Sequence, residues 1–286
     1  MIIDKPAGLT SHDVVARARR ICQERSIGHL GTLDPSATGV LPLLLGRLTR
    51  LAQFFQGREK EYYGAVRFGF ATDTYDAAGT RRGPEMPPPS REAVEAAMPA
   101  FLGSIRQTPP AFSAKKIAGV PAYKLARREL APELKPVEVE VRVFELLGME
   151  DGLAEIHVVC SAGAYVRALA HELGQSLEVG AHLSRLQRTR VGEFGLEQSH
   201  TLEQLAELAA DGRAESALLP ATALLPEMPA VVAPPDAGSR LSHGQAANLP
   251  EFSRAERVRI FTPQGRLLSI GRRVAGSLFQ PQIVLR

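Results

Sequence analysis

Alternating apolar and polar positions predict several strands along the chain. Between residues 61 and 69, the sequence EYYGAVRFG places Tyr62 and Val66 on one side of an extended segment and Tyr63 and Arg67 on the other. Tyr62 and Tyr63 therefore point in opposite directions. Further strands are expected near the N-terminus, at residues 137–147 and 153–160, after residue 180, and in a hairpin at residues 258–271 that turns at Pro263, Gln264 and Gly265.

Other segments have the spacing of amphipathic helices. In the segment from Ser11 to Glu24, Val14, Val15 and Ala18 begin an apolar stripe, and the threonine or serine that precedes it is expected to cap the helix. Further helices are expected at residues 49–56, after the cap residue Ser90, after Tyr165, and after Thr201, which forms a capping box with Gln204.

The order of these elements indicates an α+β fold, because strands and helices are mixed without a regular β-α-β alternation. Proline-rich residues 83–90 end one unit, and residues 217–238 are typical of a linker or wrapping segment. We therefore expect a large domain over residues 1–225 and a small β-rich domain over residues 226–286.

The composition is that of an ordinary soluble globular protein, with 44% hydrophobic and 23% charged residues in a chain of 286. Cys22 and Cys160 cannot build a disulfide framework, so a reducing cytoplasm is expected. The seven histidines show no metal-ligand spacing, and no glycine-rich phosphate loop follows a strand. Neither a metal nor any cofactor is therefore indicated. The N-terminus lacks a signal-peptide pattern, and no apolar run reaches about 18 residues, so no membrane is expected.

Positive charge is concentrated at the C-terminus. Residues 240–286 hold eight arginines and two glutamates, although the whole chain carries a net charge of only +3. A basic module on a slightly acidic body indicates contact with a polyanion, and the alternative is a solubilising tail.

The stretch GHLGTLDPSATGVLPLLLG, residues 28–46, holds one carboxylate, Asp34. Pro35 fixes its own φ and keeps Asp34 out of the helical region, while Gly31 and Gly39 allow turns that a Cβ would block. A carboxylate on such a rigid loop suits a nucleophile or a base. An Asp-Pro turn that leads into a buried segment is the alternative.

A second candidate stretch is TPPAFSAKKIAGVPAYKLARRE, residues 108–129. Its lysines, which include Lys115 and Lys116, are interleaved with Phe112 and Tyr123. Cations beside aromatic rings suit an RNA backbone and unstacked bases, and a charged helix face is the alternative.

Residues 28–46 closely resemble the signature of the bacterial tRNA pseudouridine synthase B (TruB) family, G-[AT]-L-D-P-x-A-T-G, in which the aspartate is catalytic. Other stretches match in the same order over roughly the first 200 residues. The resemblance implies a pseudouridine-synthase fold with a mixed, mainly antiparallel central sheet flanked by helices. It also implies an RNA-binding insertion at about residues 105–130 and a C-terminal PUA-like RNA-binding domain.

The resemblance carries over to the site residue by residue. Asp34 corresponds to the catalytic aspartate, and Arg167, in CSAGAYVRAL, to the arginine that pairs with it. Tyr62, in KEYYG, corresponds to the tyrosine that stacks on the target base and is a candidate for proton transfer at C5. Tyr165 and Leu186 correspond to residues that line the uracil pocket.

Two more positions match the family around its active site. His29 corresponds to a histidine associated with the flipped-out uridine, and Asp76 lies in a T-D-T-x-D segment that we expect to support the active-site loops. The family's P-x-x-S-A-x-K segment falls on Lys115 and Lys116, which are therefore expected to contact RNA.

The function that the resemblance implies is conversion of uridine 55 in the tRNA T loop to pseudouridine, an isomerisation that needs no cofactor. The expected partner is tRNA, bound through its T arm and acceptor end by a monomer that needs no other protein. Whether attack occurs at C1′ or C6, and which group takes the C5 proton, stays open. The alternatives are an RNA-guided rRNA pseudouridine synthase, a tRNA-binding folding chaperone, and a glycoside hydrolase, which would use two paired carboxylates.

Overall fold

A computed structural model describes residues 1–113, 116–117, 120–121 and 134–285 of the chain. Within these residues, a nine-stranded sheet forms the body of the protein. Its strands follow the order β1-β3-β12-β4-β11-β10-β7, with β2 beside β3 and β13 beside β12. Only β3 and β12 pair in parallel among them, so the sheet is mixed and mainly antiparallel, as expected. The strands are β1 (Ile2–Lys5), β2 (Ile27–His29), β3 (Thr38–Leu45), β4 (Lys60–Phe68), β7 (Gly103–Gln107), β10 (Val137–Glu150), β11 (Leu153–Cys160), β12 (Ala181–Val191) and β13 (Phe194–Gly195).

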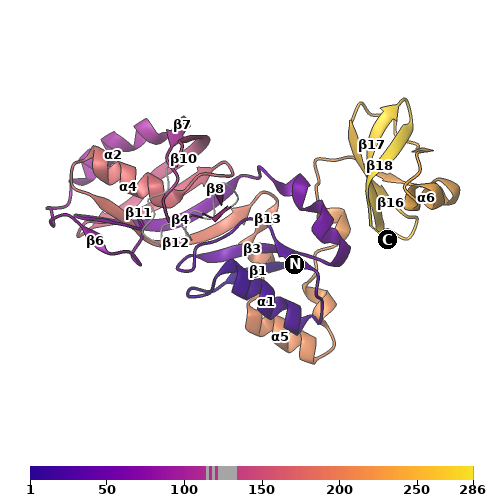
Figure 1. Cartoon of the computed structure of the whole chain (residues 1–286), viewed down its shortest axis with the longest axis horizontal. Coiled ribbons are helices and arrows are strands. Elements are labelled where there is room, and N and C mark those ends of the chain that lie inside the picture. The colour runs from indigo at the N-terminus through magenta and orange to yellow at the C-terminus, as the bar shows by residue number, and fades with distance from the viewer. Residues whose placement is uncertain (114–115, 118–119, 122–133, 286) are drawn as a thin grey trace.

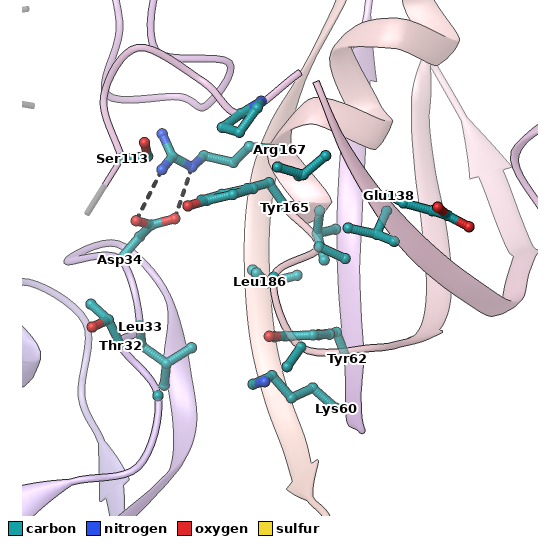
Figure 2. Close-up of a pocket in the computed structure, with 18 residues that line it drawn as sticks. Thr32, Leu33, Asp34, Lys60, Tyr62, Ser113, Glu138, Tyr165, Arg167 and Leu186 are labelled. Carbon is teal, nitrogen blue, oxygen red and sulfur yellow. Dashed lines mark hydrogen bonds and ion pairs between the residues drawn. The ribbon is translucent and has the colours of Figure 1, made fainter. Parts of the chain in front are cut away.

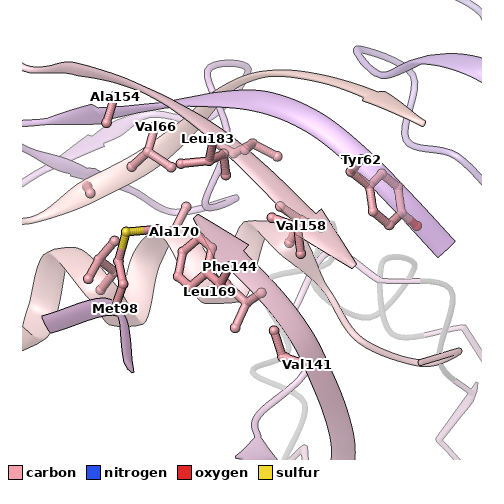
Figure 3. Close-up of a cluster of buried hydrophobic side chains, with 14 of the residues drawn as sticks. Tyr62, Val66, Met98, Val141, Phe144, Ala154, Val158, Leu169, Ala170 and Leu183 are labelled. Carbon is pink, nitrogen blue, oxygen red and sulfur yellow. The ribbon is translucent and has the colours of Figure 1, made fainter. Parts of the chain in front are cut away.

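Helices pack against the two halves of this sheet (Figure 1). The helices α2 (Arg91–Ala97) and α4 (Val166–Ser176) pack on β10 and β12, and α1 (Ser11–Ile21) and α5 (Leu202–Ala210) lie together beside β1 and β2. Between the sheet and the helices α2 and α4, buried side chains such as Val66, Phe144 and Leu169 form one core (Figure 3). Tyr62 stands at the edge of that core, where the strand β4 reaches the cavity described below.

The predicted caps are confirmed, and the predicted lengths are less accurate. Thr10 forms a capping box with Asp13 at the start of α1, and Thr201 forms one with Gln204 at the start of α5. The helix α1 ends at Ile21 and not at residue 24, because the chain turns into a left-handed conformation at Gln23, with a φ of 52°. The helix expected at residues 49–56 is part of the 3₁₀ helix η1 (Gly46–Phe55).

Short elements connect the longer ones. No helix in the described part of the chain is both long and apolar enough to cross a bilayer. The short elements are β5 (Ala71–Thr72), β6 (Arg81–Arg82), η2 (Met98–Phe101), β8 (Lys116–Ile117), β9 (Val120–Pro121), η3 (Leu196–Gln198), η4 (Ala214–Ala217) and η5 (Ala221–Ala223).

The C-terminal region is β-rich, as expected, and forms a five-stranded sheet in the order β14-β16-β17-β18-β15. The hairpin of β16 and β17 has the predicted turn, with Gly265 at a φ of 79°. Part of the stretch expected to be a linker belongs to this sheet, because β14 pairs in parallel with β16. The elements are β14 (Ala230–Val232), α6 (Pro235–Ser242), β15 (Ala247–Asn248), β16 (Arg257–Phe261), β17 (Leu267–Ala275) and β18 (Leu278–Val284).

The small sheet lies at the opposite end of the molecule from α2 and β6 (Figure 1). Apolar side chains join it to the body, since Phe261 and Ile283 share a cluster with Leu225 and Phe55. Arg259, one of the eight C-terminal arginines, is buried and donates hydrogen bonds to three carbonyls of residues 222–228. The Arg259 guanidinium therefore stabilises the fold, and its burial keeps it from contacting a polyanion.

Candidate active site

A cavity of about 580 Å³ opens where the Asp34 loop faces the strands β4 and β12 (Figure 2). Its volume lies within the range of small-molecule sites in proteins. One wall is the loop before β3, another is the turn before α4, and the floor comes from β4 and β12. The lining includes Gly31, Thr32, Leu33, Asp34, Lys60, Tyr62, Pro109, Ser113, Glu138, Tyr165, Arg167 and Leu186.

The Asp34 loop joins β2 to β3 and is tied to the N-terminal segment on both sides of the carboxylate. The backbone N–H of Leu33 donates to the Ser11 hydroxyl at 2.9 Å. The carbonyl of Pro35 accepts from the backbone N–H of Gly8 at 2.8 Å and from the Lys5 ammonium at 3.2 Å. A loop held at residues 33 and 35 keeps the side chain between them in one place, which is what a reacting carboxylate needs.

Arg167, at the start of α4, forms a two-point contact with Asp34. Its Nε lies 2.8 Å from Oδ2, and its Nη2 donates to Oδ1 at 3.1 Å. The arginine is 4% exposed, whereas 37% of the Asp34 side chain remains open to the cavity side. The planar guanidinium therefore fixes the carboxylate from behind and leaves it accessible to a ligand.

Asp76 meets the same guanidinium from the other side, with its Oδ2 at 3.7 Å from Nη1 of Arg167. The Thr74 hydroxyl donates to Asp76 at 2.6 Å, and the Thr74 carbonyl accepts from Arg167 at 2.8 Å. Nη2 of Arg167 also donates to the Phe112 carbonyl at 2.9 Å. Arg167 is thus held by three segments, one of which contains Asp76.

Opposing influences act on the pKa of Asp34. Burial raises this pKa, the charge and hydrogen bond of Arg167 lower it, and the negative charge of Asp76 raises it. Burial prevails, so the pKa of Asp34 lies above its usual value. The arginine limits the rise and helps to keep the carboxylate ionised near neutral pH.

Three other expected pocket residues line the cavity. Tyr62 and Leu186 come from neighbouring strands and lie across the cavity from the Asp34–Arg167 pair (Figure 2). Burial raises the pKa of Tyr62 to about 12, so its hydroxyl is protonated at neutral pH. Tyr165 lies beside Arg167, and its backbone N–H and carbonyl are both bonded to the Gln107 amide, at 2.7 and 3.1 Å.

The remaining expected site residues lie elsewhere. His29 ends β2 and is outside the cavity lining, and burial lowers its pKa. Asp76 reaches the site only through Arg167. Lys115 lies outside the described residues, and of Lys116 only the backbone, in β8, is described. Half of the stretch at residues 105–130 that was expected to bind RNA also lies outside the described residues.

Sequence reasoning did not single out three cations near the site. Lys60 lines the cavity two residues before Tyr62 on the same strand, a spacing that could have identified it. Lys5 is buried, and its ammonium donates to the carbonyls of Pro6, Leu9 and Pro35. Arg188 is buried on β12, between β3 and β4. The sequence does not reveal this burial, because it depends on the pairing of strands that are distant in the chain.

The chain matches two related protein families and several known proteins over most of its length. Residues 19–166 match the family described as TruB family pseudouridylate synthase (N terminal domain), and residues 167–235 match the tRNA pseudouridylate synthase B C-terminal domain. The chain is 45% identical to tRNA pseudouridine synthase B of Solibacter usitatus, over 100% of this chain and 99% of the relative. It is 46% identical to the protein of the same name from Symbiobacterium thermophilum, over 85% of this chain and 80% of the relative.

Solved structures share the fold at lower identity. A structure of an H/ACA RNP bound to a substrate RNA containing 2'-deoxyuridine matches with a TM-score of 0.74 and 26% identity, and covers 100% of this chain and 84% of that one. A Cbf5-Nop10-Gar1 complex matches with a TM-score of 0.72 and 29% identity, over 97% of this chain and 78% of that one. The α+β fold with a mixed sheet and a separate β-rich C-terminal region is therefore confirmed.

Proposed function

We propose that this chain, which belongs to the TruB family of tRNA pseudouridine synthases, converts uridine 55 in the T loop of tRNA to pseudouridine, with Asp34 as the nucleophile. The observation that carries the proposal is the Asp34 carboxylate, accessible and paired with a buried Arg167, in a cavity whose floor holds Tyr62. Relatives at 45% and 46% identity bear the name tRNA pseudouridine synthase B, which supports tRNA as the substrate.

The reaction exchanges one bond for another on the same nucleotide. The Asp34 carboxylate attacks either C1′ of the ribose or C6 of the uracil, and the N1–C1′ bond breaks. The uracil turns within the pocket, a bond forms between C5 and C1′, and the bond to Asp34 breaks, which restores the free carboxylate. The proton on C5 is finally lost to a base, while N1 gains one. Atoms and charge balance without an oxidant or reductant, which suits a site built from amino-acid side chains alone.

Each neighbouring side chain has a role in the proposed reaction. Arg167 holds Asp34 as a carboxylate and directs it into the cavity. Tyr62 stacks on the base, and its oxygen is the candidate for the C5 proton. Tyr165 and Leu186 bound the uracil pocket. His29 assists base flipping from outside the cavity, in the space that the extruded uridine leaves.

The remaining parts of the proposal concern how the RNA is held. We assign the T arm to the body, with Lys115 and Lys116 contacting the backbone, and the acceptor end to the basic C-terminal domain over residues 226–286. The body over residues 1–225 then forms the catalytic domain. A cytoplasmic monomer that needs no protein partner completes the proposal.

The decisive experiment incubates the purified protein with an unmodified tRNA transcript, without added cofactor, and maps pseudouridine at single-nucleotide resolution. Wild-type protein is expected to modify position 55 alone. Asp34→Asn is expected to bind the tRNA with similar affinity and form no product. Asp73→Asn, in the neighbouring loop, is the matched control and should keep most activity.

Other outcomes of this experiment would contradict the proposal. A full yield of pseudouridine from Asp34→Asn would show that Asp34 is not the nucleophile. Release of free uracil would indicate a glycoside hydrolase, and a restored tRNA fold with no product from wild type would indicate a chaperone. An RNA-guided enzyme, the remaining alternative, would leave a free T-arm stem-loop unmodified when that RNA replaces the tRNA transcript.

A further inference from the structure

Arg188 lies between the two halves of the candidate site. It is on β12, where its backbone pairs with Gly39 of β3 on one side and with Tyr62 of β4 on the other. The side chain is 0% exposed and is among the largest fully buried side chains in the described residues. Arg188 therefore lies on the strand between β3, which follows the Asp34 loop, and β4, which carries Tyr62.

The guanidinium of Arg188 donates hydrogen bonds to β3 and to the loop that precedes it. Its Nε bonds to the Val40 carbonyl at 2.9 Å, and its Nη2 and Nη1 point at the Gly31 and Thr32 carbonyls, at 3.0 and 3.4 Å. On its other side, the guanidinium interacts with the Tyr62 side chain, since the two residues are paired across β12 and β4 and share a face of the sheet. Within the described chain, no carboxylate forms an ion pair with it.

Such a cation is costly to bury, because it loses its hydration and gains no counter-ion at contact distance. An apolar side chain of similar length would fill the same space without that cost. What the apolar side chain could not supply is a rigid set of donors that reaches the backbone at residues 31 and 32 and the Tyr62 hydroxyl together.

We propose that Arg188 is a positioning residue for the reaction, which holds the Tyr62 hydroxyl and the Asp34 loop at one fixed separation across the cavity. This inference rests on the proposed function, because it takes Tyr62 and Asp34 as the groups that meet the uridine. Arg167 binds the Asp34 side chain itself, and Lys5 holds the loop from the opposite side.

The contact also determines how Tyr62 presents its oxygen. A guanidinium has no acceptor, so the Tyr62 hydroxyl accepts from it and keeps its own hydrogen for an acceptor in the cavity. The positive charge of Arg188 lowers the pKa of Tyr62 and so opposes the rise that burial causes. Burial still keeps the hydroxyl protonated at neutral pH, and Arg188 makes it easier for this group to give its hydrogen to an acceptor in the cavity, after which the oxygen could take the C5 proton.

The test compares Arg188→Met, Arg188→Lys and the control Arg190→Met with wild type. Arg190 lies on the same strand, is exposed, and pairs with Glu61 at 3.0 Å, so its loss removes an equal charge outside the site. For each protein we would measure thermal unfolding, tRNA affinity, and the single-turnover rate of pseudouridine formation at position 55 with saturating enzyme. Fluorine NMR of protein labelled with 3-fluorotyrosine would report on the hydroxyl, with Tyr62→Phe assigning one of five signals.

Arg188→Met is expected to lower the single-turnover rate by about 100-fold, the size of effect that small misplacements of reacting groups produce, while the tRNA affinity changes less than about threefold. Its Tyr62 fluorine signal should shift, and Arg190→Met should leave both readouts unchanged. If Arg188→Met fails to fold, Arg188→Lys takes its place, with a smaller rate loss and the same signal shifted.

Two results would overturn the inference while the proposed function stands. One is a folded Arg188 variant with a rate within about threefold of wild type. The other is a rate loss with an unmoved Tyr62 signal, because a purely structural arginine would act that way. If wild type itself forms no pseudouridine at position 55, the proposed function fails instead.

Discussion

Asp34 shows how one side chain depends on charges from distant parts of the chain. Burial and Asp76 both raise its pKa, and Arg167 lowers it. A nucleophilic carboxylate must be ionised, so the rate should fall as the pH drops through this raised pKa. A cavity that held the carboxylate without Arg167 would favour the protonated, unreactive acid at a higher pH.

We therefore predict the direction of two pH effects on the single-turnover rate. In wild type, the midpoint of the acid limb should lie above the usual aspartate pKa of about 4. Asp76→Asn removes a nearby negative charge, which lowers the pKa of Asp34 and moves the midpoint to lower pH. Each profile of single-turnover rate against pH is measured at saturating enzyme and normalised to its own maximum rate. Asp73→Asn is the control, and an Asp76→Asn midpoint that stays in place or rises would contradict the electrostatic account.

At the scale of elements, the parallel pairing of β3 and β12 holds the site together. Gly39 lies in this contact, opposite Arg188, with a φ of 100°, and an added Cβ would lie 2.2 Å from the Arg188 carbonyl oxygen. The pairing brings Arg188 beside Tyr62 and the Asp34 loop, so a shift of β3 would move both walls of the cavity.

Gly39→Ala is accordingly predicted to reduce the free energy of unfolding by more than about 3 kcal/mol, because it combines backbone strain with a clash against a central strand. Gly57→Ala is the matched control, since Gly57 has a similar φ of 87° with open space around it. Its cost should be about 1–2 kcal/mol, the strain alone. Urea unfolding of both variants measures the difference, and equal losses would show that close packing at residue 39 is unimportant.

At the scale of the whole molecule, the C-terminal charge is only partly free for RNA. Arg259 is committed to carbonyls of residues 222–228, and Arg272 pairs with Glu256 at 3.2 Å. Arg254 and Arg266 are exposed on the same domain. These two arginines are therefore the better candidates for phosphate contacts.

We predict that tRNA binding weakens strongly with salt, and that Arg254→Gln with Arg266→Gln lowers the slope of log K against log salt by about 2, since each lost phosphate contact removes about one unit. Filter binding over a series of salt concentrations gives the slope. Arg91→Gln, exposed on α2 at the other end of the molecule, is the control. If the double variant keeps the wild-type slope, the proposed contact between the C-terminal domain and the acceptor end of tRNA is wrong.

Sequence alone was sufficient for features that depend on neighbours in the chain. Helix caps at Thr10 and Thr201, the alternation around Tyr62 and the turn at Gly265 follow from local spacing and backbone preferences, and the structure has all of them. The candidate catalytic loop was also visible in sequence, because an Asp-Pro step between glycines is a local signal and its resemblance to a family signature is specific.

Only the tertiary structure decided which distant side chains meet. Arg167 reaches Asp34 across 133 positions, and the geometry of their pair depends on α4 packing on the sheet. Arg188 would pass for one more exposed arginine of a basic strand until β12 is placed between β3 and β4. Strand order and register result from burial of the whole core, and no local preference specifies them. Asp34 and Tyr62 could be proposed from the sequence because they lie in short stretches that resemble the family. The buried Arg188 guanidinium between their strands could not, because its place depends on strand order.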